Sequence, residues 1–363
     1  MEEIPVRLDA RSYRILVGPG ALGAVGPQLS RTGAGRKVVV FTDAAILKLH
    51  GGAVLDSLRR AGFDAAPHLV PEGEAAKTLD VARTGWDRLL EAGCDRTSTV
   101  VAVGGGAVGD LAGFVAATYM RGMNFVQVPT TLLAQVDASI GGKTAIDHPR
   151  AKNLIGAFYQ PRFVLADTAA LLTLPEREFR SGLAEVIKHG IVLDAQYFAD
   201  LERSLPGILA RDIPTLTRVV TGSCRIKAGV VERDEREAEL RQVLNYGHTI
   251  GHALEAATDY GRWAHGEAVS LGIVAEARIA ERLGIAQAAT TERQARMLAA
   301  VGLPVAGIGA EPVLVLEALG RDKKSRDGRV PFVFAPEIGS FRVVYDVPGA
   351  TVLETLEDLQ RAH

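Results

Sequence analysis

Runs of β-branched and other apolar residues recur through the first half of the chain, in RKVVVFTD, STVVAVGGG, NFVQVPT and RFVLAD. These runs lack polar alternation, a pattern typical of strands that are covered on both faces of a parallel sheet. Longer amphipathic stretches lie between them, such as LDVARTGWDRLLEAG, which has apolar residues at helical spacing before a closing glycine. The alternation predicts an α/β layer fold with a Rossmann-like parallel sheet.

A change of pattern divides the chain near Leu174. Before it, VRLDARSYRILVG predicts an opening hairpin, and APHLV predicts a further strand. From Ser181 to about Leu319 nearly every stretch has helical periodicity. The last section predicts a hairpin around Glu337-Ile338-Gly339 and a terminal helix in TVLETLEDLQRA. Because 363 residues exceed the commonest domain size, we expect two domains, an α/β domain at 1–174 and a mainly α-helical domain at 175–363.

Composition excludes several classes of partner. The formal net charge of −2 gives the chain no general attraction to nucleic acid or to an anionic membrane. The opening MEEIPVRLD lacks the features of a signal peptide, and the sequence has no apolar run of about 18 residues. The two cysteines, Cys94 and Cys224, are isolated and fit no CxxC pattern, so we expect buried thiols in a reducing compartment. Together these features predict a cytoplasmic protein whose anion binding is local.

A glycine-rich turn follows the strand in VVAVGGGAVGD. Gly104, Gly106 and Gly109 satisfy GxGxxG between a strand and an amphipathic helix, which predicts binding of a dinucleotide diphosphate at the helix N-terminus. A tight turn without a ligand is the alternative. No acidic residue ends the next strand, NFVQVPT, where the usual fingerprint has a ribose-binding carboxylate. Asp43, at the end of an earlier strand, is the better placed substitute.

A group of metal-ligating residue types lies in the helical half. His248 and His252 are four residues apart in LNYGHTIGHALE, so both imidazoles lie on one helical face. His265 follows them and Glu185 precedes them. Two histidines and one glutamate, with a coordination position open to substrate, are typical of catalytic zinc. The alternative is a set of hydrogen-bonded core histidines, and the absence of HExxH argues against a metalloprotease.

Basic residues also occur beside apolar or glycine-rich sequence, outside any charge run. An ordinary surface position is the alternative for each of them. As a set they predict a local cationic pocket for phosphate and carboxylate groups, with Asn153 and Asn245 as supporting donors. The set comprises Lys143, Lys152, Lys188, Lys227 and Arg241, with Arg121 and the pair Lys323-Lys324 as additions.

These segments, read together, resemble the 3-dehydroquinate synthase family. The resemblance rests on GGGAVGDLAGFVAATYMRG, QVPTTLLAQVDASIGGKTAID, KNLIGAF, GLAEVIKHG, DEREAELRQVLNYGHTIGHALE and HGEAVSLG, which occur in the family's order and span most of the chain. It implies a lyase that uses NAD and zinc or cobalt to convert 3-deoxy-D-arabino-heptulosonate 7-phosphate into 3-dehydroquinate and phosphate. The implied steps are transient oxidation by NAD, β-elimination of phosphate, re-reduction, ring opening and intramolecular aldol closure, in the shikimate route to aromatic amino acids.

The resemblance also implies roles for individual residues. The metal ligands would be Glu185, His248 and His265, and His252 would contact the substrate instead of the metal. Positions that hold NAD are matched by Asp43, Glu74, Lys77, Gly105, Gly106, Asp110, Thr130, Thr131, Asp137, Lys143 and Lys152. Positions around the substrate are matched by Asp137, Lys143, Lys152, Asn153, Lys188, Lys227, Glu237, Arg241, Asn245, His252 and either Lys323 or Lys324, of which we name Lys324. Arg121 would reach into a neighbouring subunit's site, which implies a homodimer.

Other enzyme classes combine an NAD domain with a helical metal domain. Glycerol and iron-type alcohol dehydrogenases do so, but they release reduced cofactor and need no clamp for a phosphate and a carboxylate. Sugar phosphate cyclases that make valiolone or inosose rings are closer alternatives. Their substrates lack the carboxylate, and Lys227 together with Arg241 favours a substrate that has one. A non-catalytic NAD-binding protein is a third alternative.

Overall fold

The computed structural model describes residues 1–320 and 330–362, which form two compact units. Unit 1 contains Met1–Pro175 and Arg211–Arg236, and unit 2 contains Glu176–Ala210 together with the chain from Glu237 onward. The chain therefore leaves unit 1 near the boundary predicted at Leu174, returns to it, and leaves again. Among the described helices, none combines the length and the hydropathy that crossing a bilayer requires.

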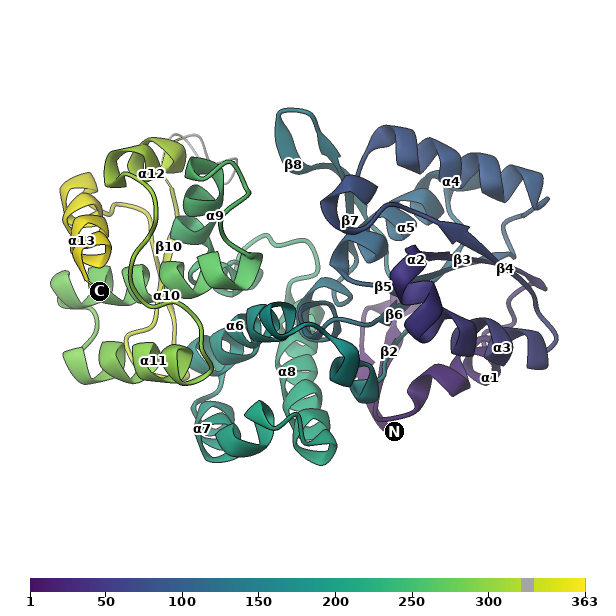
Figure 1. Ribbon diagram of the computed structural model, residues 1–363, viewed down its shortest axis with the longest axis horizontal. Helices are drawn as coiled ribbons and strands as arrows, with labels where there is room; N and C mark the ends of the chain where they lie inside the picture. Colours follow the sequence, from purple (N-terminus) through teal and green to yellow (C-terminus); the bar gives the residue numbers. More distant parts are fainter. Residues whose placement is uncertain (321–329, 363) are drawn as a thin grey trace. The chain divides into compact units, whose positions relative to one another are not determined.

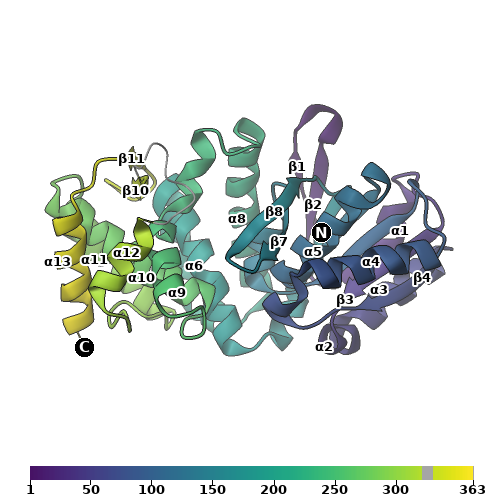
Figure 2. The same cartoon turned by 90° about the horizontal axis from the view of Figure 1, so that it is seen from above.

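Unit 1 is built on a seven-stranded sheet with the order β1-β2-β9-β6-β5-β3-β4. Figure 1 labels β2, β3, β4, β5 and β6 of this sheet. All neighbouring strands run parallel except β1 and β2, which form the predicted antiparallel hairpin at one edge (Figure 2). The strands are β1 (Glu2–Val6), β2 (Tyr13–Val17), β3 (Lys37–Thr42), β4 (Asp64–Leu69), β5 (Thr99–Gly104), β6 (Asn124–Pro129) and β9 (Phe163–Ala166).

Alternate residues of the central strands pack against different helices, because successive side chains of a strand point to opposite faces. Val38 and Val40 of β3 belong to a core with α1 (Val25–Ser30) and α3 (Gly52–Arg60). Val39 and Phe41 belong to the core with α4 (Leu79–Glu91) and α5 (Gly106–Thr118) on the other face. Both faces of the sheet are therefore covered, which is why the strands are continuously apolar in the sequence.

Four further elements, α2, β7, β8 and α8, belong to unit 1. A short helix, α2 (Ala44–Ile46), follows β3, and β7 (Lys143–His148) pairs with β8 (Ala151–Phe158) in a separate two-stranded ribbon (Figure 2). The long helix α8 (Ile213–Arg233) packs against β1. Ion pairs tie α8 and the residues after it to the hairpin, including Arg225 with Glu2 at 3.0 Å and Glu235 with Arg11 at 2.7 Å. A segment with helical periodicity late in the chain thus belongs to the α/β unit.

Unit 2 is mainly helical, as its sequence pattern predicts. Helices α9 and α10 pack on each other, α6 packs on α10, and α12 packs on α9 (Figure 1). The predicted hairpin is formed by β10 (Phe332–Phe334) and β11 (Arg342–Val344). The helices are α6 (Glu176–Leu193), α7 (Ala195–Leu209), α9 (His248–Ala257), α10 (His265–Arg282), α11 (Ala288–Ala300), α12 (Pro312–Leu319) and α13 (Gly349–Arg361). The expectation of a parallel-sheet α/β fold with a helical part is confirmed.

Candidate functional site

The sheet of unit 1 has a topological switch point between β3 and β5. From β3 the chain proceeds to β4 on one side, whereas from β5 it proceeds to β6 on the other. Ligands of open α/β sheets bind outside the carboxyl ends of the strands at such a point. Asp43 directly follows β3 and Gly105 directly follows β5, so two of the predicted NAD residues flank the switch point.

The glycines of the turn serve two different purposes. A Cβ atom on Gly104 would lie 2.8 Å from Val108, and one on Gly109 would lie 2.7 Å from Gln127, so both positions are closed by packing. A Cβ on Gly105 or Gly106 would meet its nearest neighbour at 3.2 Å. Gly105 is also the N-cap of the 13-residue helix α5 and has no side chain with which to cap it. These two glycines therefore leave the first N–H groups of α5 open to an anion.

The neighbouring strand ends supply hydroxyl and carboxylate groups. Thr130 follows β6, and its N–H donates to the Gly104 carbonyl at 2.9 Å. Thr131 Oγ1 accepts from the Ala134 N–H at 3.1 Å. Asp43 Oδ1 accepts from the Ile46 N–H at 2.8 Å, which caps α2 and leaves Oδ2 outside that bond. The donor set fits a dinucleotide, with main-chain donors for the diphosphate and an aspartate oxygen for a ribose hydroxyl.

Lys77 connects predicted NAD residues to a predicted substrate residue. Its side chain is 3% exposed, and its ammonium lies 2.8 Å from Asp110 Oδ2 in α5 and 3.9 Å from Glu74. The same ammonium donates to Asn153 Oδ1 in β8. Lys152 Nζ is 4.0 Å from Glu74, so it joins the group. The structure thus brings together Lys152 and Asn153, which the sequence places in one cationic pocket, with Glu74, Lys77 and Asp110.

Burial raises the pKa of Asp110 to about 6, although the nearby Lys77 ammonium acts to lower it. The native state therefore holds a proton on this carboxyl at pH values where the unfolded chain has released it. By linkage, the native state loses stability as the pH rises from about 4 through about 6. We expect wild type to become less stable relative to Asp110→Asn over this interval, measured by denaturant unfolding at a series of pH values.

Asp80→Asn is the matched control for this prediction, because the Asp80 side chain is 91% exposed. Its unfolding is measured over the same pH series, which separates the effect of removing a buried carboxylate from that of removing an exposed one. A constant difference between wild type and Asp110→Asn would contradict the raised pKa.

Further predicted substrate residues lie elsewhere in unit 1. Lys227, on α8, donates to the Asp137 carbonyl at 2.6 Å and forms an ion pair with the Asp137 carboxylate. Lys143 begins β7 and is exposed. Arg121 lies in a turn where its own φ is +65° and that of Met120 is +51°. Residues other than glycine rarely adopt positive φ angles of this size, so the backbone of this exposed turn is strained.

In unit 2 three helices bring one carboxylate and two imidazoles together. Glu185 of α6, His248 of α9 and His265 of α10 each offer a ligand atom, and these atoms lie within 4.8 Å of one another. Glu185 is fully buried, with Oε1 3.4 Å from His248 Nε2 and 3.9 Å from His265 Nε2. Neither Glu185 oxygen accepts a hydrogen bond from a described residue, although the Lys188 ammonium forms an ion pair with Oε2. A buried carboxylate in this state fits a divalent cation.

The contacts of Nδ1 in His248 and in His265 determine that Nε2 of each ring faces Glu185. His248 Nδ1 lies 3.1 Å from the Tyr246 carbonyl oxygen, which can only accept, so Nδ1 carries the proton. His265 Nδ1 lies 3.4 Å from Glu255 Oε1. Both Nε2 atoms are thereby presented as ligands, as in carboxylate–histidine–zinc arrangements. Sequence reasoning missed Glu255, although it lies only three residues after His252.

His252 falls outside the set centred on Glu185. Its ring packs edge to face on His248 at 5.2 Å, and it groups with Glu255 and His265. The four-residue spacing alone had allowed His248 and His252 to share one cation. In the structure His248 groups with Glu185 and His265, whereas His252 groups with Glu255 and His265, and the ligand atoms within each group lie within 4.8 Å of one another.

Close backbone contacts allow the three helices to converge. A Cβ on Gly266, next to His265, would lie 1.9 Å from the Ser181 carbonyl oxygen of α6. A Cβ on Gly272 would lie 1.9 Å from the Gly247 carbonyl oxygen at the start of α9. No side chain fits at either crossing, so glycine at both positions lets α10 approach the helices that carry the other two ligands.

Other predicted substrate residues of unit 2 surround the turn before α9. Lys188 is 1% exposed and donates to the Leu244 carbonyl at 2.6 Å. Asn245 Nδ2 donates to Glu237 Oε1 at 3.0 Å, and Arg241 is 2% exposed in the same turn. Charged groups this deeply buried need partners or ligands. Lys324 and Lys323 lie outside the described residues.

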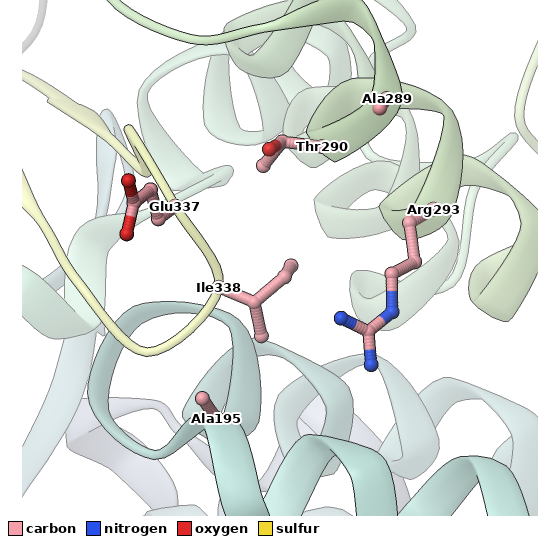
Figure 3. Close-up of a pocket in the computed structure, with 6 residues that line it drawn as sticks. All are labelled: Ala195, Ala289, Thr290, Arg293, Glu337 and Ile338. Carbon is pink, nitrogen blue, oxygen red and sulfur yellow. The ribbon is translucent and has the colours of Figure 1, made fainter.

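Unit 2 also has a surface pocket of about 340 Å³ that none of the predicted site residues lines (Figure 3). It lies among α7, α11 and the β10–β11 turn, which contribute Ala195, Arg293 and Ile338. Arg293 forms a 2.6 Å ion pair with Glu202 and packs over the Phe198 ring. The pocket thus lies apart from the residues that the sequence assigns to the reaction.

Two family models together match residues 67–325. The model for the N-terminal part of 3-dehydroquinate synthase matches residues 67–181, and that for the C-terminal part matches residues 182–325. The 3-dehydroquinate synthase of Geobacter metallireducens is 52% identical over 348 residues, which cover 95% of this chain and 96% of that protein. That of Crocosphaera subtropica is 45% identical and covers 98% of this chain and 99% of the relative.

Solved structures with the same two-part fold are more distant in sequence. A 2-deoxy-scyllo-inosose synthase complexed with carbaglucose-6-phosphate, NAD+ and Co2+ has a TM-score of 0.90 at 25% identity and covers 98% of this chain and all of that one. The 2-epi-5-epi-valiolone synthase of Streptomyces hygroscopicus subsp. jinggangensis, with NAD+ and Zn2+, has a TM-score of 0.87 at 27% identity and covers 99% of this chain and 98% of that one. A probable glycerol dehydrogenase from Sinorhizobium meliloti, at 18% identity and a TM-score of 0.65, shares the fold and covers 95% of this chain and 96% of that one.

Proposed function

The chain belongs to the 3-dehydroquinate synthase family, and from this premise we propose which of its residues perform the family's reaction. The reaction converts 3-deoxy-D-arabino-heptulosonate 7-phosphate into 3-dehydroquinate and phosphate. The observation that carries the proposal is the set of Glu185, His248 and His265, whose ligand atoms lie within 4.8 Å of one another around the buried Glu185 carboxylate. This set occurs in a chain whose other unit has a glycine turn at the switch point of a parallel sheet.

The cofactors are assigned to the two units separately. Glu185, His248 and His265 would hold Zn2+ or Co2+, since both metals suit two imidazoles and a carboxylate. The turn at Gly105 and Gly106, with Asp43, Thr130 and Thr131, would hold NAD. When bound, NAD accepts and returns a hydride, and the metal supplies Lewis acidity that acidifies a substrate hydroxyl. The solved cyclases with NAD+ and Co2+ or Zn2+ support this assignment.

Charged side chains of this protein would bind the two anionic ends of the substrate. Lys143, Lys152, Lys227 and Arg241 supply fixed positive charge, which stabilises phosphate and carboxylate groups most strongly where water is excluded. Lys227 and Arg241 are 5% and 2% exposed, so their charges are shielded from solvent. The Lys188 ammonium beside Glu185 and the His252 imidazole are further donors to substrate oxygens. Asn245, held by Glu237, presents an oriented amide.

The function is tested by following two products at once. Purified protein is incubated with the heptulosonate phosphate, NAD and Zn2+, while released phosphate and NADH are measured together. We expect phosphate release over many turnovers with no accumulation of NADH, because the hydride returns within each cycle. Accumulating NADH would instead indicate a dehydrogenase. Release of phosphate only from a sugar phosphate without a carboxylate would indicate another cyclase.

We also propose that the enzyme is a homodimer in which Arg121 acts in the partner's site. Support comes from the resemblance and from the exposed, strained turn that presents Arg121 beside Met120, which is 44% exposed. The test mixes two inactive variants, Arg121→Ala and Arg241→Ala. A mixed dimer would have one intact site, so we expect about a quarter of wild-type activity at equal mixing after subunit exchange. No recovery in exchanged mixtures would show that Arg121 acts within its own subunit.

We place the enzyme in the cytoplasm. Support comes from Cys94 and Cys224, which are both buried and both free, as expected in a reducing compartment. Cys224 is held in the core by a hydrogen bond from Sγ to the Gln135 carbonyl at 3.3 Å, and burial raises the pKa of its thiol to about 12. Fractionation of cells that produce the protein tests this placement, and recovery outside the cytoplasmic fraction would contradict it.

A further inference from the structure

The N-terminus of α9 has an unusual cap. Its N-cap residue, Gly247, has a φ of +76° and no side chain that could accept a hydrogen bond. A Cβ at this position would lie 2.5 Å from Ile273 and 2.9 Å from the Val269 carbonyl oxygen of α10. The start of α9 is therefore pressed against α10, and no ordinary capping residue fits there.

Glu276 of α10 supplies the missing acceptors from across the helix pair. Its Oε2 accepts from the Gly247 N–H at 2.8 Å, and its Oε1 accepts from the Ile250 N–H at 3.3 Å. Gly247 and Ile250 are the N-cap and the third residue of α9. In a capping box these two N–H groups are satisfied by two side chains of the same helix. Here one fully buried carboxylate from another helix satisfies both.

The two bonds bracket His248, the first residue of α9. Its imidazole is oriented by Nδ1, which lies 3.1 Å from the Tyr246 carbonyl oxygen. Tyr246 is itself held, because its hydroxyl donates to Gln294 Oε1 at 2.5 Å. The direction of His248 Nε2 therefore depends on the backbone from Tyr246 to Ile250, and Glu276 holds this segment at Gly247 and at Ile250.

We propose that Glu276 is a positioning residue for the metal site, which it serves by holding the backbone that aims His248 Nε2 at Glu185. Glu276 acts through Gly247 and Ile250 and does not contact the metal itself. The proposal rests on the proposed function only in placing a divalent cation at Glu185, His248 and His265. A misplaced imidazole weakens metal binding, as loss of outer partners does in other metal sites.

The test is Glu276→Gln, which keeps the shape of the side chain but leaves one acceptor oxygen for two N–H donors. We expect Zn2+ affinity to fall about 10- to 100-fold, measured by competition with a chromogenic chelator. The visible absorption of the Co2+-loaded protein should change in position or intensity, because the ligand geometry changes. NAD affinity should stay that of wild type. Glu281→Gln, at an exposed position of the same helix, should match wild type in every measurement.

A second variant keeps the test decisive if Glu276→Gln does not fold. Glu276→Asp keeps the carboxylate but shortens its reach, so we expect a smaller loss of Zn2+ affinity and a similar spectral change. Wild-type affinity and an unchanged Co2+ spectrum in a folded variant would overturn the inference. If His248→Ala binds Zn2+ as tightly as wild type, the proposed metal site itself is wrong. If only the positioning role of Glu276 is wrong, His248→Ala still loses Zn2+ affinity while the Glu276 variants keep it.

Discussion

His248→Ala is expected to deplete the enzyme of its metal and to lower turnover by a factor on the order of 1,000 or more, which corresponds to about 4 kcal/mol of transition-state stabilisation. The variant removes one of the three proposed ligands, Glu185, His248 and His265, and the remaining pair cannot hold a cation as tightly. Metal content after dialysis, measured by atomic absorption, checks this expectation. NAD affinity should be nearly unchanged, because the residues proposed to hold NAD belong to the other unit.

His252→Ala is the matched control, since His252 lies on the same helix one turn away. This variant should retain stoichiometric metal while losing activity through weaker substrate contact. Full metal occupancy in His248→Ala, or metal loss confined to His252→Ala, would show that the wrong histidine has been assigned as a ligand.

Arg241→Ala is expected to lower kcat/KM by about 100- to 1,000-fold, mainly through a higher KM. Arg241 is 2% exposed, and a guanidinium in such a site can form two charge-assisted hydrogen bonds with a carboxylate or a phosphate. The factor corresponds to about 3–4 kcal/mol, within the range for removal of one partner from a buried ionic contact. Steady-state kinetics, metal analysis and NAD titration on the same preparation separate a binding role from a structural one.

Arg241→Lys should recover part of the lost kcat/KM, because it restores the positive charge but lacks the planar guanidinium group. Arg296→Ala is a control at an exposed arginine whose side chain is 68% accessible, and it should match wild type. Equal losses of substrate, metal and NAD binding in Arg241→Ala would show that the residue is structural.

The fold of unit 1 could be predicted because local patterns specify it. Continuous apolar runs marked β3, β5, β6 and β9, and the glycines after β5 marked the start of α5. The β7–β8 ribbon was not predicted, because β8 is largely exposed and lacks a clear period of two. The membership of α8 in unit 1 was also hidden, since helical periodicity shows that one face is buried but not which partner buries it.

Part of the proposed metal site could be predicted from the sequence. Residue types and the spacing of His248 and His252 predicted a cation, but spacing alone could not choose between His252 and His265. That choice depends on how α10 crosses α9, which Gly247 and Gly272 make possible. Glu255 and Glu276 were missed because their roles arise from contacts between helices. No pattern in a single segment reports such contacts.

The return of the chain to unit 1 at Arg211–Arg236 affects its synthesis on the ribosome. When Pro175 emerges, the β1–β2 edge still lacks α8, whose buried residues include Val219, Val220 and Cys224. The nascent sheet must therefore keep an apolar edge uncovered while the ribosome translates α6 and α7. Vectorial synthesis consequently completes unit 1 only once Arg236 has been made, after Glu176–Ala210 of unit 2 has already been translated. A gene fragment that stops at the first crossing would encode an unfinished sheet prone to aggregation.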